Sequence, residues 1–258
     1  MKKTDPLAAA VSLARKAGAI LLESSRGIIR TKGQPGDFVT RADYASERFL
    51  INEILKAFPG HAILSEETRS DIKNPAAHPH LWIVDPCDGT ADFHFKVPFF
   101  AVSVAYAEFG EVVAGAAYDP VRREMFYAGA GRGSFCSGRR LAVSGKKDIS
   151  GTLVDVGCPY KQDDYGRLAG IQKTVFRRGA RLRNLGSAVL EACYVADNRL
   201  SMYVDYGPRP WDVAASTLIV EEAGGVVAIL GGKTIFDAKG FVFGSKARAA
   251  VAKKAFCL

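Results

Sequence analysis

The ten residues Leu81-Trp82-Ile83-Val84-Asp85-Pro86-Cys87-Asp88-Gly89-Thr90 are the most informative stretch of the chain. The first four are apolar and predict a short buried strand. The next six place two carboxylates three residues apart, with a proline between them and a glycine turn after them. Ligand sites in α/β proteins lie beyond the carboxyl ends of strands, so the stretch predicts a polar site at the end of residues 81–84.

Two aspartates in this position suit a hard cation. Mg²⁺ prefers oxygen ligands in an octahedral array, and Asp85, Asp88 and the carbonyl of Cys87 supply such oxygens. Gly89 and Thr90 would then open a short helix whose backbone N–H groups meet a phosphate. Taken alone, the turn has a second interpretation, because aspartates often cap helices or brace turns.

The Asp-Gly-Thr ending also resembles the aspartyl-phosphatases of the haloacid dehalogenase type. Those enzymes need a nucleophilic Asp two residues before the second Asp, and this chain has Pro86 at that place. Proline cannot attack phosphorus, so a covalent aspartyl-phosphate route is excluded.

Further acidic residues stand at the ends of other predicted elements. Glu66 and Glu67 follow an apolar run, Asp43 opens a helix after Thr40, and Asp212 begins a later helix. Each has a plain interpretation, because paired glutamates are usually solvated and an Asp often caps a helix. Their co-occurrence and order along the chain favour one shared site.

The hydrophobic pattern predicts α+β layering in the first half and α/β layering in the second. Helices are expected over 6–25, 43–58, 163–178, 187–196, 211–223 and from 246, and strands over 61–64, 81–84, 99–108, 112–118, 124–128, 153–156, 180–184, 200–204, 226–230 and 240–243. We place the boundary between an N-terminal half, residues 1–145, and a C-terminal half, residues 146–258, at the Gly/Ser/Lys-rich stretch 144–151.

Composition narrows the class of protein. With 48% hydrophobic and 24% charged residues, the chain is an ordinary folded protein, and it has no apolar run of membrane-spanning length. Five scattered cysteines without a C-x-x-C pair indicate neither a disulfide framework nor a zinc site, and together with the absence of a signal-peptide core they predict a cytoplasmic location.

The chain is basic, with 35 Lys and Arg against 27 Asp and Glu, a net charge of +8. This excess fits an anionic substrate, a nucleic-acid partner or simply a solvated basic surface. The densest cluster, Arg177, Arg178, Arg181 and Arg183, lacks the interleaved aromatic residues of a single-strand binding platform.

Taken in order, these segments resemble the inositol monophosphatase family over almost the whole chain. The matching segments are 39–43 (V-T-x-x-D), 66–67 (G-E-E), 85–90 (D-P-[LI]-D-G-T), 97–103 after the metal loop, 186–188 at the substrate-side turn, and 211–215 with 222–225 (W-D-x-A-A…E-A-G-G). The resemblance implies a layered αβαβα sugar-phosphatase sandwich. It also implies an enzyme that hydrolyses a small phosphate monoester with two or three Mg²⁺ ions, using metal-activated water and no phosphoenzyme.

The resemblance also implies a role for each residue. Glu66, Asp85 and the Cys87 carbonyl would hold one metal ion, Asp85, Asp88 and Asp212 a second, and a third ion would sit near Glu66, with Glu67 behind the ligands. Asp43, Thr90 and Glu66 would act on the attacking water, and Lys32 is either a neutralising cation or an exposed lysine. The substrate-binding residues would be Asp88, Gly89, Thr90, Gly186, Ser187, Ala188, Asp205 and Asp212.

Several positions depart from the commonest family pattern: Ser65, Cys87, Ala91, Asp92, Asp205 and Ser216. Asp92 and Asp205 bear on substrate identity. Inositol monophosphate is the first expectation, and fructose 1,6-bisphosphate, histidinol phosphate, 3′-phosphoadenosine 5′-phosphate, NADP and a broad range of sugar phosphates are the alternatives. The resemblance implies a homodimer. A regulatory role in binding nucleic acid or protein is an alternative of another class.

Overall fold

The computed structural model describes residues 4–24, 26–31, 38–69, 72–157 and 165–255. The helices are α1 (Pro6–Glu23), α2 (Arg41–Ala57), α3 (Thr90–Phe95), α4 (Tyr165–Arg177), α5 (Ala188–Ala196), α6 (Pro210–Glu222) and α7 (Lys246–Ala255), with a short 3₁₀ turn η1 (Pro75–Ala77). The strands are β1 (Ile28–Thr31), β2 (Phe38–Thr40), β3 (Ala62–Ser65), β4 (Leu81–Asp88), β5 (Ala101–Glu108), β6 (Glu111–Asp119), β7 (Glu124–Gly129), β8 (Gly133–Cys136), β9 (Arg139–Arg140), β10 (Leu153–Val156), β11 (Arg181–Arg183), β12 (Met202–Tyr206), β13 (Val226–Leu230) and β14 (Gly240–Gly244).

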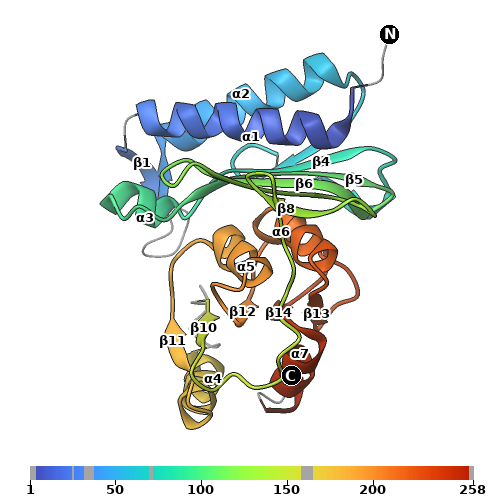
Figure 1. Ribbon diagram of the computed structural model, residues 1–258. Coiled ribbons are helices and arrows are strands. Elements are labelled where there is room, and N and C mark those ends of the chain that lie inside the picture. Colours follow the sequence, from blue (N-terminus) through green and yellow to red (C-terminus); the bar gives the residue numbers. More distant parts are fainter. Residues whose placement is uncertain (1–3, 25, 32–37, 70–71, 158–164, 256–258) are drawn as a thin grey trace.

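These elements stack in five alternating layers (Figure 1). Helices α1 and α2 cover one face of a seven-stranded sheet of order β3-β4-β5-β6-β7-β8-β9. Helices α5 and α6 lie between that sheet and a five-stranded sheet of order β11-β10-β12-β14-β13, and α4 and α7 cover the far side. The expected αβαβα sandwich is therefore confirmed.

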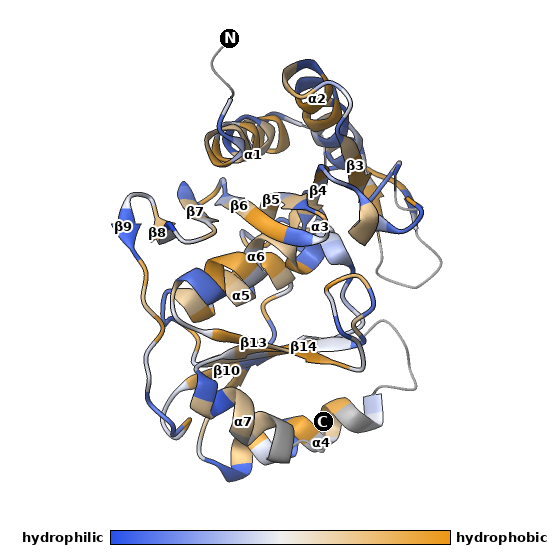
Figure 2. Cartoon of the chain, turned by 90° about the vertical axis from the view of Figure 1, so that its right-hand side faces the viewer, coloured by the Kyte–Doolittle hydropathy of each residue, from blue (hydrophilic) through white to orange (hydrophobic). Residues whose placement is uncertain are grey.

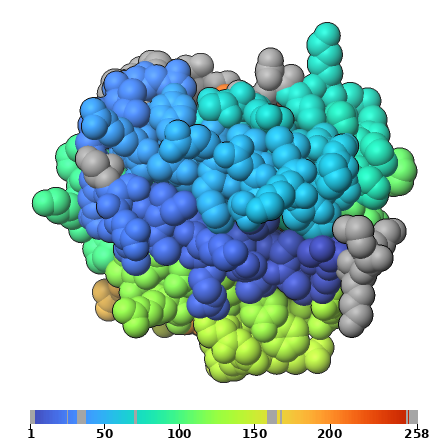
Figure 3. Space-filling view, turned by 90° about the horizontal axis from the view of Figure 1, so that it is seen from above, coloured from blue at the N-terminus to red at the C-terminus, as the bar shows by residue number. Residues whose placement is uncertain are grey.

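The outer pair of helices begins at strong capping signals. Asp5 accepts a hydrogen bond from the N–H of Leu7 and is followed by Pro6, and Thr40 forms a capping box with Asp43 at the start of α2. Figure 3 shows the two helices lying side by side across this face. At Gly18 an added Cβ would lie 2.5 Å from the ring of Tyr118, so a glycine lets α1 approach β6 closely.

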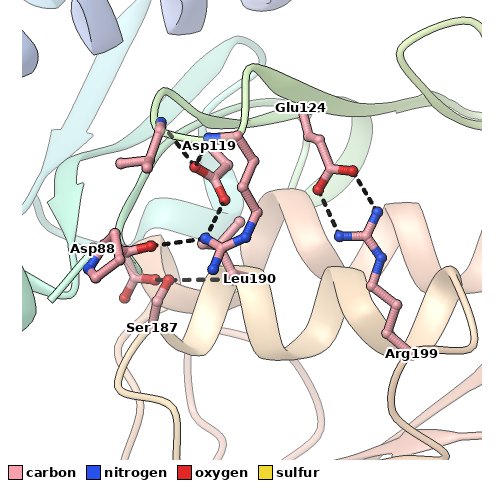
Figure 4. A network of polar contacts seen from close by, with 9 residues as sticks. Asp88, Asp119, Glu124, Ser187, Leu190 and Arg199 are labelled. Carbon is pink, nitrogen blue, oxygen red and sulfur yellow. Dashed lines mark hydrogen bonds and ion pairs between the residues drawn. The ribbon is translucent and has the colours of Figure 1, made fainter.

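The middle layer is apolar on nearly all sides because sheets cover both of its faces. In α6, Val213 to Val220 are all buried, and Figure 2 shows this helix as mainly hydrophobic. At Gly115 of β6 an added Cβ would lie 2.9 Å from the Cα of Ala215, which places α6 directly against the sheet. At the rim, Arg199 donates to the carboxylate of Glu124 through its two terminal nitrogens, Nη1 and Nη2, and ties the segment after α5 to β7 (Figure 4).

The structure corrects the sequence-based boundaries in two respects. The strand expected over 81–84 continues to Asp88, and the short strands β1, β2, β8 and β9 were not expected. These four are two to four residues long and two of them are exposed along their length, so they carry little hydrophobic pattern. The boundary at 145 stays a prediction. Helix α6 from the second half packs against strands of both sheets.

A stack of rings closes the end of the seven-stranded sheet that lies at the amino terminus of β4. The rings of His61 and His80 are 4.4 Å apart and nearly parallel, and the Trp82 indole donates to Nδ1 of His61 at 3.2 Å. An indole N–H can only donate, so Nδ1 of His61 must be unprotonated. The Tyr106 hydroxyl lies 2.6 Å from Nδ1 of His80 and donates to Glu108.

Acid is therefore expected to destabilise this end of the sheet through His61. Burial, with added repulsion from His80, lowers the pKa of His61 below its ordinary 6.5. The unfolded chain then binds the proton more readily, so stability is lost as pH falls from about 6.5 through the lower folded pKa. Urea unfolding of His61→Gln should lose less stability than wild type between about pH 7.5 and 5.5. His78→Gln is the control, and an equal loss in both variants would contradict the prediction.

Candidate active site

A bulge in β4 brings Asp85 and Asp88 to the same side of the sheet. Asp85 pairs with Ser103 and Asp88 with Ala101, so three steps along β4 oppose two along β5. Side chains alternate along a regular strand, so residues three apart would face opposite ways. The extra residue restores a common direction, and Pro86 lies inside the bulge, where proline is tolerated in a sheet.

Asp212 completes an acidic cluster with these two residues. It lies in the first turn of α6, where its carboxylate accepts the N–H of Arg209 at 2.7 Å. One oxygen of each of Asp85, Asp88 and Asp212 lies within 4.8 Å of the others. Burial raises the pKa of all three carboxyl groups, that of Asp88 to about 7, and the charge of Glu66 adds to the shift in each.

Glu66 follows β3, the strand that runs parallel to β4 at its side. Its charge acts on Asp85 and Asp212, which places it beside the cluster, although it is not one of the three residues that converge. The turn is held by Glu47 of α2, whose buried carboxylate accepts from the Ser65 hydroxyl and from the N–H groups of Glu67 and Thr68. Sequence reasoning missed Glu47, although it stands four residues after Asp43 and therefore on the same face of α2.

Asp43 and Thr90 meet next to the cluster. The Thr90 hydroxyl lies 2.9 Å both from Oδ1 of Asp43 and from the carbonyl oxygen of Cys87. A hydroxyl has one hydrogen to donate, so these two oxygens compete for the Thr90 hydrogen. Asp43 is fully buried, and burial raises the pKa of its carboxyl group while hydrogen bonds from Thr40 and Thr90 lower it. The Cys87 thiol is buried in the core, so only its backbone faces the site.

The turn at residues 186–188 is attached to the end of β4 through Asp88. Oδ2 of Asp88 accepts from the Ser187 hydroxyl and from the N–H of Val189, the latter at 2.9 Å, and Figure 4 shows Ser187 beside Asp88. Gly186 has a φ of +96°, and an added Cβ would lie 2.6 Å from Oδ2 of Asp92. Both its conformation and its close approach to Asp92 therefore require glycine.

Glu191 holds this turn from behind and was also missed from sequence. Its buried carboxylate accepts the N–H groups of Leu185 and Gly186, each at 2.8 Å. The turn then presents Ser187, whose hydroxyl also caps α5 by accepting the N–H of Leu190. Glu191 falls in the first turn of α5, where its position alone suggests only a favourable charge near the helix start.

Replacing Glu191 by Ala is expected to loosen the turn and lower stability by about 1–3 kcal/mol, because two partly buried donors lose their acceptor. Glu191→Gln keeps an acceptor oxygen and should stay close to wild type. Urea unfolding of both variants checks the order. Equal stability of Ala and Gln variants would show that the two hydrogen bonds do not hold the turn.

Asp205 of β12 is buried, and other protein groups already bind its carboxylate. It is 8% exposed, and its oxygens accept from the Tyr203 hydroxyl and from the N–H of Tyr206, both at 2.7 Å. Burial raises its pKa to about 6. Its charge also acts on Asp88, so it borders the same space. A role in binding substrate stays a prediction.

Comparison with known proteins decides the family. The family model described as "Inositol monophosphatase family" matches residues 3–256. The chain belongs to this family. A protein named Nus factor SuhB from Pasteurella multocida is 38% identical to this chain over 236 residues, 86% of this chain and 84% of that protein.

Solved structures with the same fold agree with this assignment. The extragenic suppressor protein SuhB from Bartonella henselae superimposes with a TM-score of 0.89 at 33% identity and covers 98% of both chains. An IMPase from Thermotoga maritima has a TM-score of 0.86 at 33% identity and covers 98% of this chain and 97% of its own.

The residues of this inositol monophosphatase family site fit a divalent metal. The donors are hard carboxylate oxygens from β4 and from the start of α6, and Mg²⁺ prefers such oxygens. Buried carboxylates that raise one another's pKa are costly to charge without a cation, and a bound ion would remove that cost. Lys32, which the resemblance also singles out, lies outside the described residues.

Proposed function

We propose that the protein hydrolyses a small phosphate monoester with Mg²⁺, with inositol monophosphate as the first candidate substrate. The observation that carries the proposal is that Asp212, which is distant in the chain, converges with Asp85 and Asp88 within 4.8 Å at the end of β4. Glu66, Asp85 and the Cys87 carbonyl would hold one ion, and Asp85, Asp88 and Asp212 a second. A third would sit near Glu66. Bound Mg²⁺ supplies Lewis-acid stabilisation of phosphoryl charge and a more acidic water.

The protein groups around the metals would orient the nucleophile. Thr90 would accept a hydrogen from the attacking water while its own hydroxyl hydrogen goes to Asp43, which its 2.9 Å contact with Oδ1 allows. Asp43 is in turn fixed by the side chain and N–H of Thr40. Phosphoryl transfer depends chiefly on such positioning and on charge stabilisation.

The leaving group would lie toward the turn at 186–188 and Asp205. Gly186, Ser187 and Ala188 would border this space. Gly89 would leave it open, since an added Cβ there would lie 2.9 Å from the carbonyl oxygen of Phe99 and 3.3 Å from that of Gly186. Asp205 would accept a hydroxyl of the substrate. An Asp is one methylene shorter than the Glu usual here in the family, so a substrate bulkier than inositol monophosphate is the alternative.

A phosphate-release screen tests both the phosphatase activity and the identity of the substrate. Inositol, fructose, histidinol and nucleotide phosphates would each be offered with Mg²⁺ and with EDTA. Mg²⁺-dependent release from any monoester supports the phosphatase, and the substrate with the highest kcat/KM identifies the class. No release from any of them, in a protein shown to bind Mg²⁺, would overturn the proposal.

A second candidate function is binding of a nucleic acid or a protein. Two observations favour it: curated relatives carry the name Nus factor SuhB, and this chain has a net charge of +8. Nucleic-acid affinity would fall steeply with salt concentration. Absence of binding to RNA and DNA at low salt would remove the nucleic-acid form of this candidate.

The homodimer and the cytoplasmic location stay predictions. In the part of the chain that the structure describes, none of the helices combines the length and the apolar character needed to cross a bilayer.

A further inference from the structure

A basic pocket lies at the end of α3 opposite to Thr90. Its volume is about 290 Å³, and three of the residues that line it are cations: Arg26, Lys96 and Arg123. The other described residues of the lining are apolar and include Leu22, Phe100 and Val121, and no Asp or Glu is among the described lining residues. A concave site of this composition is complementary to an anion with an apolar part.

Arg26 is held in place before any ligand arrives. Its Nη1 donates to the carbonyl of Phe93 at 3.3 Å, and its guanidinium lies 4.9 Å from the centre of the Phe93 ring. The carbonyl of Arg26 itself contacts Nδ1 of His94 at 2.8 Å. Such anchoring reduces the side-chain entropy that an arginine loses when it binds a ligand.

The two other cations occupy backbone positions that disfavour them. Lys96 ends α3 with a φ of +64°, and Arg123 has a φ of +56° in the turn between β6 and β7. Glycine or asparagine is usual in this left-handed conformation, because a side chain there strains the backbone. Strain of this kind gathers at functional sites. Here both strained residues are cations and line the same pocket.

The described part of the chain offers no carboxylate that neutralises Arg26, Lys96 or Arg123 by an ion pair. The neighbouring Arg122, in contrast, pairs with Asp119. Three like charges around one cavity repel one another, and an anion between them would relieve that repulsion. The unbalanced charge is what points to an anion as the ligand, and the backbone strain is a separate feature of two of these residues, Lys96 and Arg123.

We propose that this pocket binds a small phosphorylated molecule at a site separate from the metal centre. The phosphate group would lie among the three cations, and the organic part would lie against the apolar wall. Helix α3 connects the two sites, since Thr90 begins it and the N–H of Lys96 closes it on the carbonyls of Asp92 and Phe93. A ligand in the pocket would therefore stabilise the helix that carries the candidate catalytic hydroxyl.

Binding of inorganic phosphate and of glycerol 2-phosphate to the full chain in EDTA tests the proposal. Without metal, the carboxylates of the candidate active site repel anions, so calorimetric titration reports the basic pocket. Saturable binding is expected, with at least about a tenfold loss of affinity in Arg26→Gln. Lys173→Gln on α4 removes one exposed positive charge elsewhere and should bind as wild type. Absence of saturable binding, or equal losses in both variants, overturns the proposal.

Lys96→Gly and Arg123→Gly separate a binding role from a structural one. Each removes a charge and relieves the left-handed strain, so each should weaken phosphate binding at least about tenfold while the thermal midpoint of the ligand-free protein stays equal or rises. Wild-type affinity in both variants overturns the proposal. So does a shift from dimer to monomer in sedimentation, because a second copy of the chain would then be what covers the pocket.

Discussion

Asp88→Asn is expected to reduce Mg²⁺-dependent phosphate release by a factor on the order of a thousand, since loss of about 4 kcal/mol of metal-centred stabilisation corresponds to that factor. The fold should persist, because an Asn side-chain oxygen still accepts the Ser187 hydroxyl and the N–H of Val189. Glu23→Gln, an exposed carboxylate at the end of α1, is the matched control and should keep full activity. Initial rates at saturating Mg²⁺ measure the effect.

Thermal unfolding tests the assignment of Asp88 as a metal ligand without the use of a substrate. Mg²⁺ at about 100 times its dissociation constant should stabilise the wild-type protein by about 2.7 kcal/mol. In Asp88→Asn this stabilisation should largely disappear, while the metal-free variant should be at least as stable as the metal-free wild type because one buried negative charge is gone. Retained activity together with a retained Mg²⁺ shift would refute the assignment of Asp88 as a ligand.

The sequence pattern was enough to predict the layered fold because most elements carry strong local signals. Asp5-Pro6 marks the start of α1, and the apolar run 226–230 coincides with β13. The end of β4 could not be predicted. Pro86 indicated a turn, but the chain continues as a bulged strand because β5 supplies a partner for Asp88 through Ala101. Pairing of that kind depends on a segment distant in sequence.

In the candidate site, too, some residues could be predicted from the local sequence and others could not. The carboxylates of Asp85, Asp88 and Asp212 stand next to strand and helix ends, so their place could be inferred from element boundaries. Glu47 and Glu191 stand inside or near the start of helices and look like ordinary helical glutamates. Their function is to accept backbone N–H groups of turns that only the folded chain brings to them.

Thr90→Val is expected to lower kcat by about 10²–10⁴-fold, the usual contribution of a group that takes part in proton transfer. Valine has nearly the shape of threonine but can neither receive a hydrogen from water nor pass one to Asp43, which the present 2.9 Å contact permits. Thr90→Ser keeps the hydroxyl and is the matched control. It should retain kcat within about tenfold. Rates of phosphate release over a range of Mg²⁺ and substrate concentrations separate kcat from both affinities.

The comparison between Thr90→Val and Asp43→Asn tests whether the two residues act as a unit. The Thr90 hydroxyl is the link between the candidate nucleophile and Asp43, so removal of either residue should break the same path. The double variant should then be about as slow as the slower single variant, because effects of residues that act together are not additive. Multiplicative losses would show that Thr90 and Asp43 act independently and that the shared proton path is wrong. A normal Mg²⁺-induced rise in unfolding temperature in Thr90→Val would place its defect in water activation rather than in metal binding.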